Sequence, residues 1–351
     1  MPESPILFKN QTSDALYARL SPLGVSARLA RRLQAAVLRQ DALPVELPET
    51  STRLLAELRV RTQVPHLKLQ RREVSPQDGF VKYLFRGAGE DPFESVAIPL
   101  LHHADAAKYV ACVSSQVGCA MGCAFCATGR MGFRRNLEPW EMVDQVIQIQ
   151  ARAPHPVRGV VFMGMGEPLL NYDAVIMAAR ILSEPCGLAI AAKAITLSTV
   201  GIVPAIRRFT AERQPYRLVV SLTSADPHVR VALLPVEQIH PTTELLAALR
   251  EYHAATKQRI TLAWTMIEGI NTRPADAQQL AELTRGLPVK LDLIDVNDAT
   301  GQFLPPTPAT LAAFRDALRQ HLAAPVARRY SGGRDIHAAC GMLSTAKPAA
   351  P

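Results

Sequence analysis

From about residue 109 onward the chain alternates between short apolar stretches and amphipathic helical stretches, and this alternation restricts the possible folds more than any other feature. Strands are predicted at 109–114, 157–163, 193–198, 217–222, 258–265 and 289–294, and helices at 138–152, 172–184, 202–209, 243–255, 275–286 and 308–322. Strands linked by helices form a parallel sheet, because parallel pairing needs a long crossover connection. Six such units predict an α/β fold, a partial (β/α)6 barrel whose site lies at the carboxyl ends of the strands.

Three cysteines directly follow the first predicted strand. Cys119, Cys123 and Cys126 are spaced Cys-x3-Cys-x2-Cys on a loop rich in Gly and Ala, which lets a backbone wrap around a bulky group. Three thiolates on a 4Fe-4S cluster leave one iron open. The loop resembles that of the radical S-adenosylmethionine (SAM) enzymes, in which the open iron chelates SAM and the reduced cluster splits it to a 5'-deoxyadenosyl radical. A zinc site and ordinary buried cysteines are the alternatives, but zinc usually takes two separated ligand pairs.

Polar residues close four of the predicted strands. They are Gly166 and Glu167 after the second strand, Ser198 at the third, Ser221 at the fourth and Asn297 after the sixth. Because the carboxyl ends of parallel strands meet at one rim, this arrangement predicts a bound polar cofactor. Glu167 offers a carboxylate to an ammonium group, although Gly-Glu-Pro is also a common way to begin a helix.

The part of the chain before the barrel has a different character. Residues 1–65 are predicted to form a basic helical domain, with helices at 15–20, capped by Ser13 and Asp14, at 25–38 and at 51–60. A connecting β-hairpin is predicted at 66–100, a core domain at 101–343 and a disordered tail at 344–351. Glu94 lies on the hairpin, where a plain exposed carboxylate is the alternative to a functional one.

The charge is strongly positive. The net charge is +8, and residues 1–75 carry twelve Lys/Arg against seven Asp/Glu. This balance favours a polyanionic partner such as nucleic acid, although a merely basic enzyme also fits. A signal peptide and a run of about 18 apolar residues are both missing from the sequence, so we expect a cytoplasmic protein without membrane contact.

Two more cysteines complete a pattern with the loop. The segments Ser-Ser-Gln-Val-Gly-Cys, Met-Gly-Met-Gly-Glu-Pro-Leu-Leu-Asn, Thr-Leu-Ser-Thr and Asp-Ile-His-Ala-Ala-Cys-Gly together resemble the RlmN/Cfr family of radical SAM RNA methyltransferases. The resemblance runs from about residue 93 to 343. A cysteine seven residues before the cluster and another near the C-terminus distinguish this family, and Cys112 and Cys340 match both. Cys186 lies between predicted elements and is assigned no role.

The resemblance implies a function and a mechanism. It implies methylation of carbon 2 or carbon 8 of an unstacked adenine in rRNA or tRNA, with two SAM molecules per turnover, a 4Fe-4S cluster and an electron donor such as a flavodoxin system. Cys340 would carry the methyl group, Cys112 would release the product by forming a disulfide with it, and Glu94 would remove the ring proton. The positions that match SAM-binding residues are Gly166, Glu167, Ser198, Ser221, Leu222, Thr223 and Asn297. A monomer is expected.

The chain departs from the family pattern at the rim. Thr223 stands where the family has His, Ala263 replaces a Glu, Val296 replaces a Trp, and Met342 replaces a Gln. We therefore predict a divergent RNA methyltransferase. A radical SAM enzyme with a non-RNA substrate is one alternative. A basic RNA-binding protein with a structural cluster is another.

Overall fold

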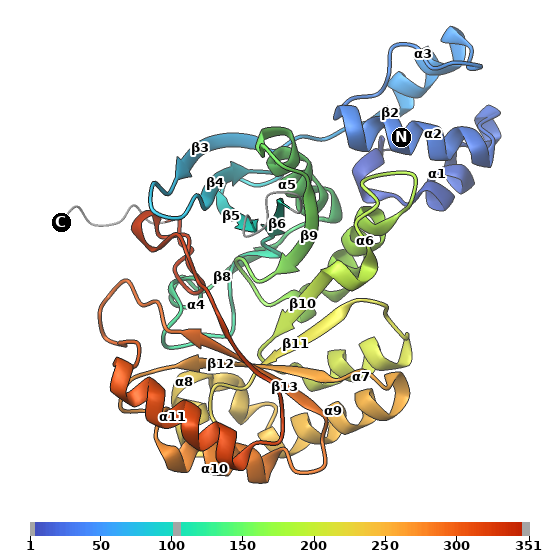
Figure 1. The fold of residues 1–351 in the computed structure, drawn as a ribbon. Helices are drawn as coiled ribbons and strands as arrows, with labels where there is room; N and C mark the ends of the chain where they lie inside the picture. The colour runs from blue at the N-terminus through green and yellow to red at the C-terminus, as the bar shows by residue number, and fades with distance from the viewer. Residues whose placement is uncertain (1–3, 101–106, 346–351) are drawn as a thin grey trace.

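The computed structural model describes residues 4–100 and 107–345, and a ten-stranded sheet dominates it (Figure 1). The order along the sheet is β14-β13-β12-β11-β10-β9-β6-β5-β4-β3. The strands that pair in parallel are β6 (Lys108–Cys112), β9 (Val157–Phe162), β10 (Ile195–Thr199), β11 (Arg217–Ser221), β12 (Ile260–Met266), β13 (Val289–Asp295) and β14 (Val326–Arg329). Most of their apolar side chains are buried, as the interior strands of a parallel sheet require.

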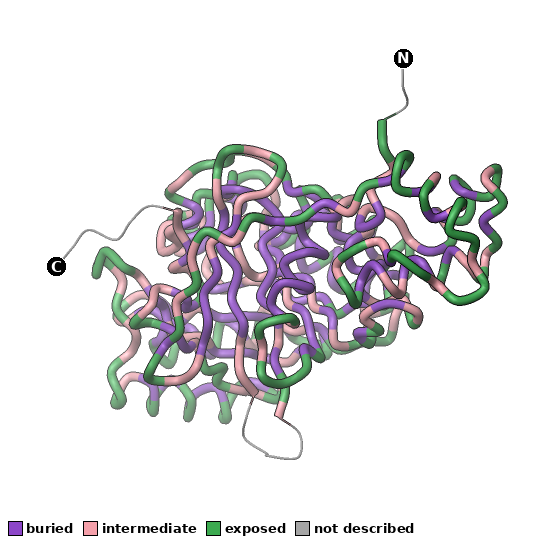
Figure 2. The backbone as a smooth tube through the Cα atoms, turned by 90° about the horizontal axis from the view of Figure 1, so that it is seen from above, coloured by how far each residue is buried: buried purple, intermediate pink, exposed green. Residues whose placement is uncertain are grey.

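Helices cover the outside of this sheet (Figure 1). The longer ones are α5 (Pro139–Arg152), α6 (Tyr172–Ser183), α7 (Val203–Ala211), α9 (Thr242–Thr256), α10 (Pro274–Leu283) and α11 (Pro308–His321). Helix α5 begins where the sequence dictates, with Pro139 in its first turn and a capping box between Glu138 and Glu141. Buried positions follow the central strands and the inner faces of the helices (Figure 2). The six predicted strand–helix units are confirmed, with bounds that differ by a few residues.

The structure has one parallel strand more than the sequence predicted. Strand β14 pairs with β13, with Leu291 opposite Val326. Its sequence is Val-Ala-Arg-Arg, and its residues are half-buried or exposed at the edge of the sheet, so it lacks the apolar run that marks a buried strand. This strand leads directly into the segment that carries Cys340.

The segment predicted as a connecting hairpin is part of the same sheet. It forms three antiparallel strands, β3 (Lys68–Val74), β4 (Val81–Arg86) and β5 (Phe93–Leu100). Strand β5 also pairs antiparallel with β6, which joins these strands to the barrel sheet. All three strands lie within the segment 66–100 that the sequence predicts as a β-hairpin, and the structure adds that they belong to the core sheet. Local sequence gave the strands, but not the long-range pairing that joins them to the barrel. As a result, Glu94 lies close to the strand that ends at Cys112.

The N-terminal helices form a module with its own core. Helices α1 (Ser13–Leu20), α2 (Ala27–Gln40) and α3 (Thr52–Arg61) bury a separate apolar cluster, joined by the short parallel pair β1 (Ile6–Leu7) and β2 (Thr62–Gln63). The predicted cap at Ser13 and Asp14 is wrong by one residue, because the hydroxyl of Thr12 accepts from the amide of Ala15.

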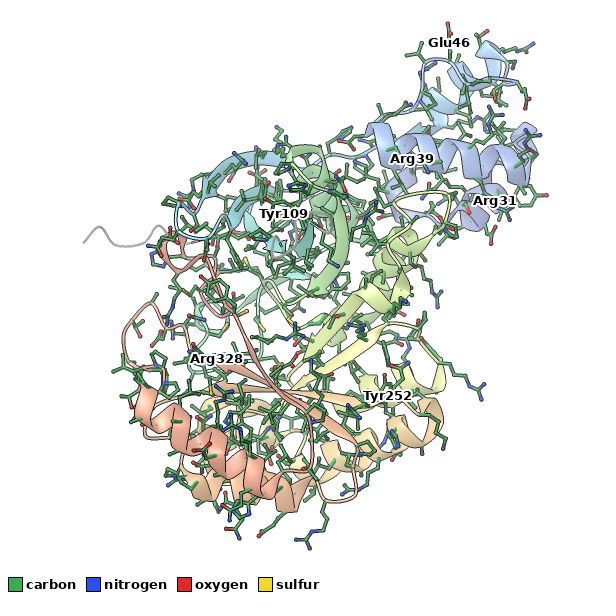
Figure 3. All side chains as sticks on the ribbon, in the orientation of Figure 1. Arg31, Arg39, Glu46, Tyr109, Tyr252 and Arg328 are labelled. Carbon is green, nitrogen blue, oxygen red and sulfur yellow. The ribbon has the colours of Figure 1, made fainter. Side chains whose placement is uncertain are left out.

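Many arginines of this module are engaged within it. Arg32 donates to the carbonyl of Pro48 and pairs with Glu49, and Arg59 donates to the carbonyl of Pro44. Arg31 and Arg39 extend from α2, well separated from Arg328 on β14 (Figure 3). The module therefore presents a basic surface that is partly neutralised by its own acceptors.

A buried lysine joins the module to the barrel. The ammonium of Lys9, fully buried, donates to Asp41 at 2.5 Å, to the carbonyl of Pro65 at 2.7 Å and to Asp144 of helix α5. Asp41, His66 and Asp144 lie close enough together to hold a metal ion. The lysine ammonium occupies the space between the two carboxylates, so we interpret this group as an ion-pair lock and not as a metal site.

Replacing Lys9 with methionine is expected to lower the free energy of unfolding by about 3–5 kcal/mol, because the buried Asp144 then loses its cation. Urea unfolding of the full chain under anaerobic conditions measures the change. Arg207→Met, which removes an exposed ion pair with Glu251, should cost no more than about 1 kcal/mol. The double replacement Lys9→Met with Asp144→Leu should regain most of the loss. Full stability of the single Lys9 variant would contradict the lock.

Shorter elements complete the described chain. They are strands β7 (Gln116–Gly118) and β8 (Phe133–Asn136), helices α4 (Ala127–Arg130) and α8 (Pro227–Leu233), and 3-10 turns at Phe8–Asn10, Ser21–Leu23, Pro168–Asn171, Ala192–Ala194, Pro235–Gln238 and Arg334–Ile336. Within 4–100 and 107–345, the helices are too short or too polar to cross a bilayer. The predicted tail lies mostly outside the described residues, from 346 onward.

Candidate functional site

The cysteine loop follows the carboxyl end of β6 and is held by a small hairpin. Cys119 donates its amide to the carbonyl of Gly132 at 3.1 Å, beside the β7–β8 pair. Gly118 has a φ of +70°, and a Cβ there would lie 1.8 Å from the Gly132 carbonyl oxygen. Glycine is therefore required at position 118, where β7 passes close to the backbone next to β8.

The three loop cysteines lie in one low-dielectric region. Cys119 and Cys123 are buried and Cys126 is half-buried. Burial raises the pKa of Cys119 to about 12 and raises the pKa of Cys123, and the neighbouring sulfurs add to both shifts. A bound cation would offset this cost, because thiolates are the ligands of iron. Three thiols on one loop, with no second pair of Cys or His ligands beside them in the sequence, fit a cluster better than a single zinc ion.

Glu167 lies at the end of β9 in a buried cradle. Its carboxylate accepts from the amides of Leu169 at 3.0 Å and Val200 at 2.9 Å, and burial raises its pKa to about 7. A ligand ammonium would favour the ionised form. Gly166 has a φ of +99°, and a Cβ there would lie 2.5 Å from the side chain of Gln116. Glycine at this position therefore lets the backbone pack directly against Gln116.

Two other predicted SAM positions have buried oxygens in need of a donor. Among the described residues, Oγ1 of Thr223 and Oδ1 of Asn297 have no hydrogen-bond partner, although both side chains are buried. Buried polar atoms are normally satisfied, so these two fit a ligand that offers hydroxyl or amino groups, as SAM does. Thr223 also has a φ of +62°, a strained conformation for a β-branched residue and one found at functional sites.

The remaining rim positions are less informative. Ser198 and Ser221 are half-buried on β10 and β11. The backbone of Leu222 is already engaged, because its amide donates to Ala263 and its carbonyl accepts from Arg230. Leu222 therefore offers apolar contact rather than a free backbone group.

The C-terminal segment brings Cys340 to the cluster loop. The carbonyl of Gly341 accepts from the amide of Ala127 at 2.7 Å, and that of Leu343 accepts from the Thr128 hydroxyl at 2.7 Å. The Cys340 thiol lies near Cys126, and surrounding protein atoms raise its pKa even though its side chain is exposed. The segment therefore lies directly over the loop.

Cys112 and Cys340 are electrostatic neighbours. Burial raises the pKa of the Cys112 thiol, and the proximity of Cys340 raises it further. The sequence resemblance implied that these cysteines meet, and in the structure the two thiols lie close enough to influence each other's ionisation. All six cysteines of the chain are free thiols, so the disulfide implied as an intermediate is not formed in this state.

Glu94 is fully buried on β5 and faces the same segment. The amide of Ser344 donates to its Oε2 at 2.9 Å, and the ammonium of Lys82 lies 3.3 Å from its Oε1. Burial raises the pKa of Glu94, while Lys82 acts in the opposite direction. An exposed strand carboxylate, the alternative considered from sequence, is wrong.

Sequence reasoning missed three residues of the site. Lys82, buried on β4, pairs with both Glu73 and Glu94. Gln116 accepts from the amide of Glu167 at 2.9 Å. Arg230 is fully buried on α8, pairs with Glu237, donates to the carbonyl of Val200 at 2.8 Å and lies near Cys123. Only Arg230 carried a sequence signal, as a charge in an otherwise apolar helical stretch. Cys186 lies apart, next to Glu184 on the loop that contacts the N-terminal module.

Comparison with known proteins agrees with this geometry. Residues 113–281 match the model of the radical SAM superfamily. The chain is 49% identical over 340 residues to a "Probable RNA methyltransferase" of Myxococcus xanthus, covering 96% of this chain and 93% of that protein. It is 43% identical over 269 residues to the "Dual-specificity RNA methyltransferase RlmN" of Syntrophobacter fumaroxidans, covering 76% and 77%.

A solved structure is also similar over nearly the whole chain. The crystal structure of a radical SAM methyltransferase from Sphaerobacter thermophilus superposes with a TM-score of 0.87 at 38% identity, covering 97% of this chain and 99% of that one. The similarity thus includes the N-terminal helices as well as the barrel.

Proposed function

Because the chain belongs to the RlmN-like family of radical SAM RNA methyltransferases, we propose that it methylates a ring carbon, carbon 2 or carbon 8, of an adenine in rRNA or tRNA. The observation that carries the proposal is the C-terminal segment. The segment that carries Cys340 is hydrogen-bonded to the cluster loop at Ala127 and Thr128. Further along, the amide of Ser344 donates to the carboxylate of Glu94.

The rim residues are suited to the cofactors of this family. Cys119, Cys123 and Cys126 would hold a 4Fe-4S cluster. Glu167, Thr223 and Asn297 would bind SAM through the buried carboxylate and the two unsatisfied oxygens. When bound, the cluster and SAM supply the methyl group and the one-electron chemistry, with two SAM molecules used per turnover. An external donor of the flavodoxin type would supply the electrons.

The chain's own residues divide the remaining work. The Cys340 thiol is exposed to the site and would carry the transferred carbon as a thioether. The buried Cys112 would attack the sulfur of Cys340 to release methylated RNA, leaving a disulfide that a reductant must open. Glu94 would take the ring proton as a carboxylate that Lys82 keeps ionised.

RNA binding is proposed from charge and organisation. We propose that residues 1–65 act as a basic accessory domain beside a core of 101–343, with residues 66–100 extending the core sheet. An unstacked adenine is expected, because a base edge must leave the stack to be modified. A cytoplasmic monomer remains our prediction.

Mass spectrometry of nucleosides tests the proposal. RNA from cells with and without the gene is digested and compared with synthetic 2-methyladenosine and 8-methyladenosine. We expect one methyladenosine to disappear from rRNA or tRNA when the gene is removed, and fractionation of the RNA then locates it. Identical nucleoside profiles in both strains would refute an RNA substrate and direct attention to SAM cleavage with small molecules.

A further inference from the structure

A cavity opens next to Cys340. It has a volume of about 410 Å³, and its lining includes Arg328, Arg329, Tyr330 and Arg334 from the C-terminal region and Asp295 and Asn297 from the end of β13. Ser331 connects it to the site, because its hydroxyl accepts from the amide of Cys340 at 3.0 Å and from Nδ2 of Asn297 at 3.1 Å.

Each of the three arginines has one polar contact that orients it and still has N–H donors to offer a ligand. Arg328 contacts Asp295 at 2.6 Å, Arg329 contacts Asp292 at 2.7 Å, and Arg334 donates to the carbonyl of Val296 at 3.2 Å. A guanidinium has five N–H donors, so one short contact orients each group and leaves donors for an anion. The side chains of Arg328 and Arg329 are 48% and 56% exposed. Such half-exposed, oriented guanidinium groups suit the oxygens of a phosphate.

The aromatic residue of the cavity is held at two points. The hydroxyl of Tyr330 donates to Asp78 at 2.8 Å, and its ring meets Phe80 at 71° with centroids 6.1 Å apart. The residue is nevertheless 75% exposed. A ring fixed by its hydroxyl and by one ring contact, with most of its surface exposed, provides a platform on which a base can stack at a low cost in ordering.

The cavity floor offers acceptors. Oδ1 of Asp295 is buried and has no hydrogen-bond partner among the described residues. Asp78, Asp292 and Asp295 together offset the charges of the three arginines, so a small free anion is a poor fit. A ligand with one phosphate, an aromatic ring and amino donors matches the whole set.

We propose that this cavity binds the RNA nucleotide that flanks the reacting adenine, with its base on Tyr330 and its phosphate on Arg328 and Arg329. The inference rests on the proposed function, since it assumes an RNA substrate. Its role is to hold the strand in register, so that the neighbouring adenine reaches Cys340. This segment would then carry both the reactive thiol and a determinant of the sequence context.

Two variants test the subsite with unmethylated RNA from cells that lack the gene. Tyr330→Ala should raise the KM for RNA about tenfold through loss of stacking, whereas Tyr330→Phe, which keeps the ring, should stay within about twofold. Arg329→Gln should raise the KM about tenfold and reduce the slope of log affinity against log salt by about one. SAM cleavage without RNA should be unchanged in all three.

Arg207→Gln is the matched control. Arg207 is also about half-exposed and also contacts a carboxylate, that of Glu251 at 3.0 Å, but it lies on α7 away from the cavity. It should leave the KM and the salt slope unchanged. If the wild-type protein methylates RNA and the Tyr330→Ala and Arg329→Gln variants match it in both quantities, the subsite is refuted alone. If the wild-type protein modifies no RNA, the proposed function fails and this inference with it.

Discussion

Replacing Cys340 with alanine is expected to reduce RNA methylation by roughly a thousandfold or more, because the methyl carbon then has no covalent carrier. Cys340 lies over the cluster loop, near both Cys126 and Cys112, and its neighbours Gly341 and Leu343 are fixed by hydrogen bonds to the loop. The alanine variant should therefore keep its fold and its cluster. Incorporation of labelled methyl groups into RNA, with the absorption spectrum of the reconstituted cluster, measures both effects.

Replacing Cys112 should have a different outcome. Without its thiol, the bond between Cys340 and the RNA cannot be resolved, so protein and RNA should accumulate as a covalent adduct. Denaturing gel electrophoresis detects the adduct, and nuclease treatment should collapse it. Cys186→Ala serves as the control, because this half-buried cysteine lies beside Glu184, away from the site, and it should turn over normally. Multiple turnovers by either the Cys340 or the Cys112 variant would rule out the two-cysteine route.

The barrel could be predicted from sequence because its information is local. Each strand–helix unit carries its own apolar period and its own start and stop signals, as Pro139 and the Glu138–Glu141 capping box do for α5. Strand β14 was not predicted, because its sequence, Val-Ala-Arg-Arg, lies at the sheet edge and lacks a run of buried apolar residues. The pairing of β5 with β6 could not be predicted, because it is a contact between segments that no local pattern specifies.

The same distinction applies to the site. Cysteine spacing and strand-end motifs are contiguous, so the loop cysteines and Glu167 could be predicted, and a resemblance supplied Cys112 and Cys340. The role of Lys82 could not be predicted, because a lysine on a strand is normally expected to be exposed to solvent. It becomes informative only once β4 pairs with β5 and brings its ammonium to Glu94.

Replacing Glu94 with glutamine is expected to lower the methylation rate by about 10²–10⁴-fold, the usual contribution of a positioned general base. Glu94 has no exposed surface, and burial raises its pKa, while the ammonium of Lys82 at 3.3 Å opposes that shift. A carboxylate base works in its ionised form, so activity should be lost as the pH falls through this pKa. SAM cleavage without RNA should not depend on Glu94.

Lys82 is expected to determine the pH at which this activity is lost, because its charge lowers the pKa of Glu94. In Lys82→Met the opposing cation is gone, so the pKa of Glu94 rises further and the acidic limb of the rate profile should move to higher pH by about 1–3 units. Lys82→Arg keeps the charge and should keep the limb near its original place. Single-turnover methylation rates at a series of pH values, with saturating RNA, measure the shift. A Lys82→Met variant whose rate falls equally at every pH would show that Lys82 supports the fold and does not hold Glu94 ionised.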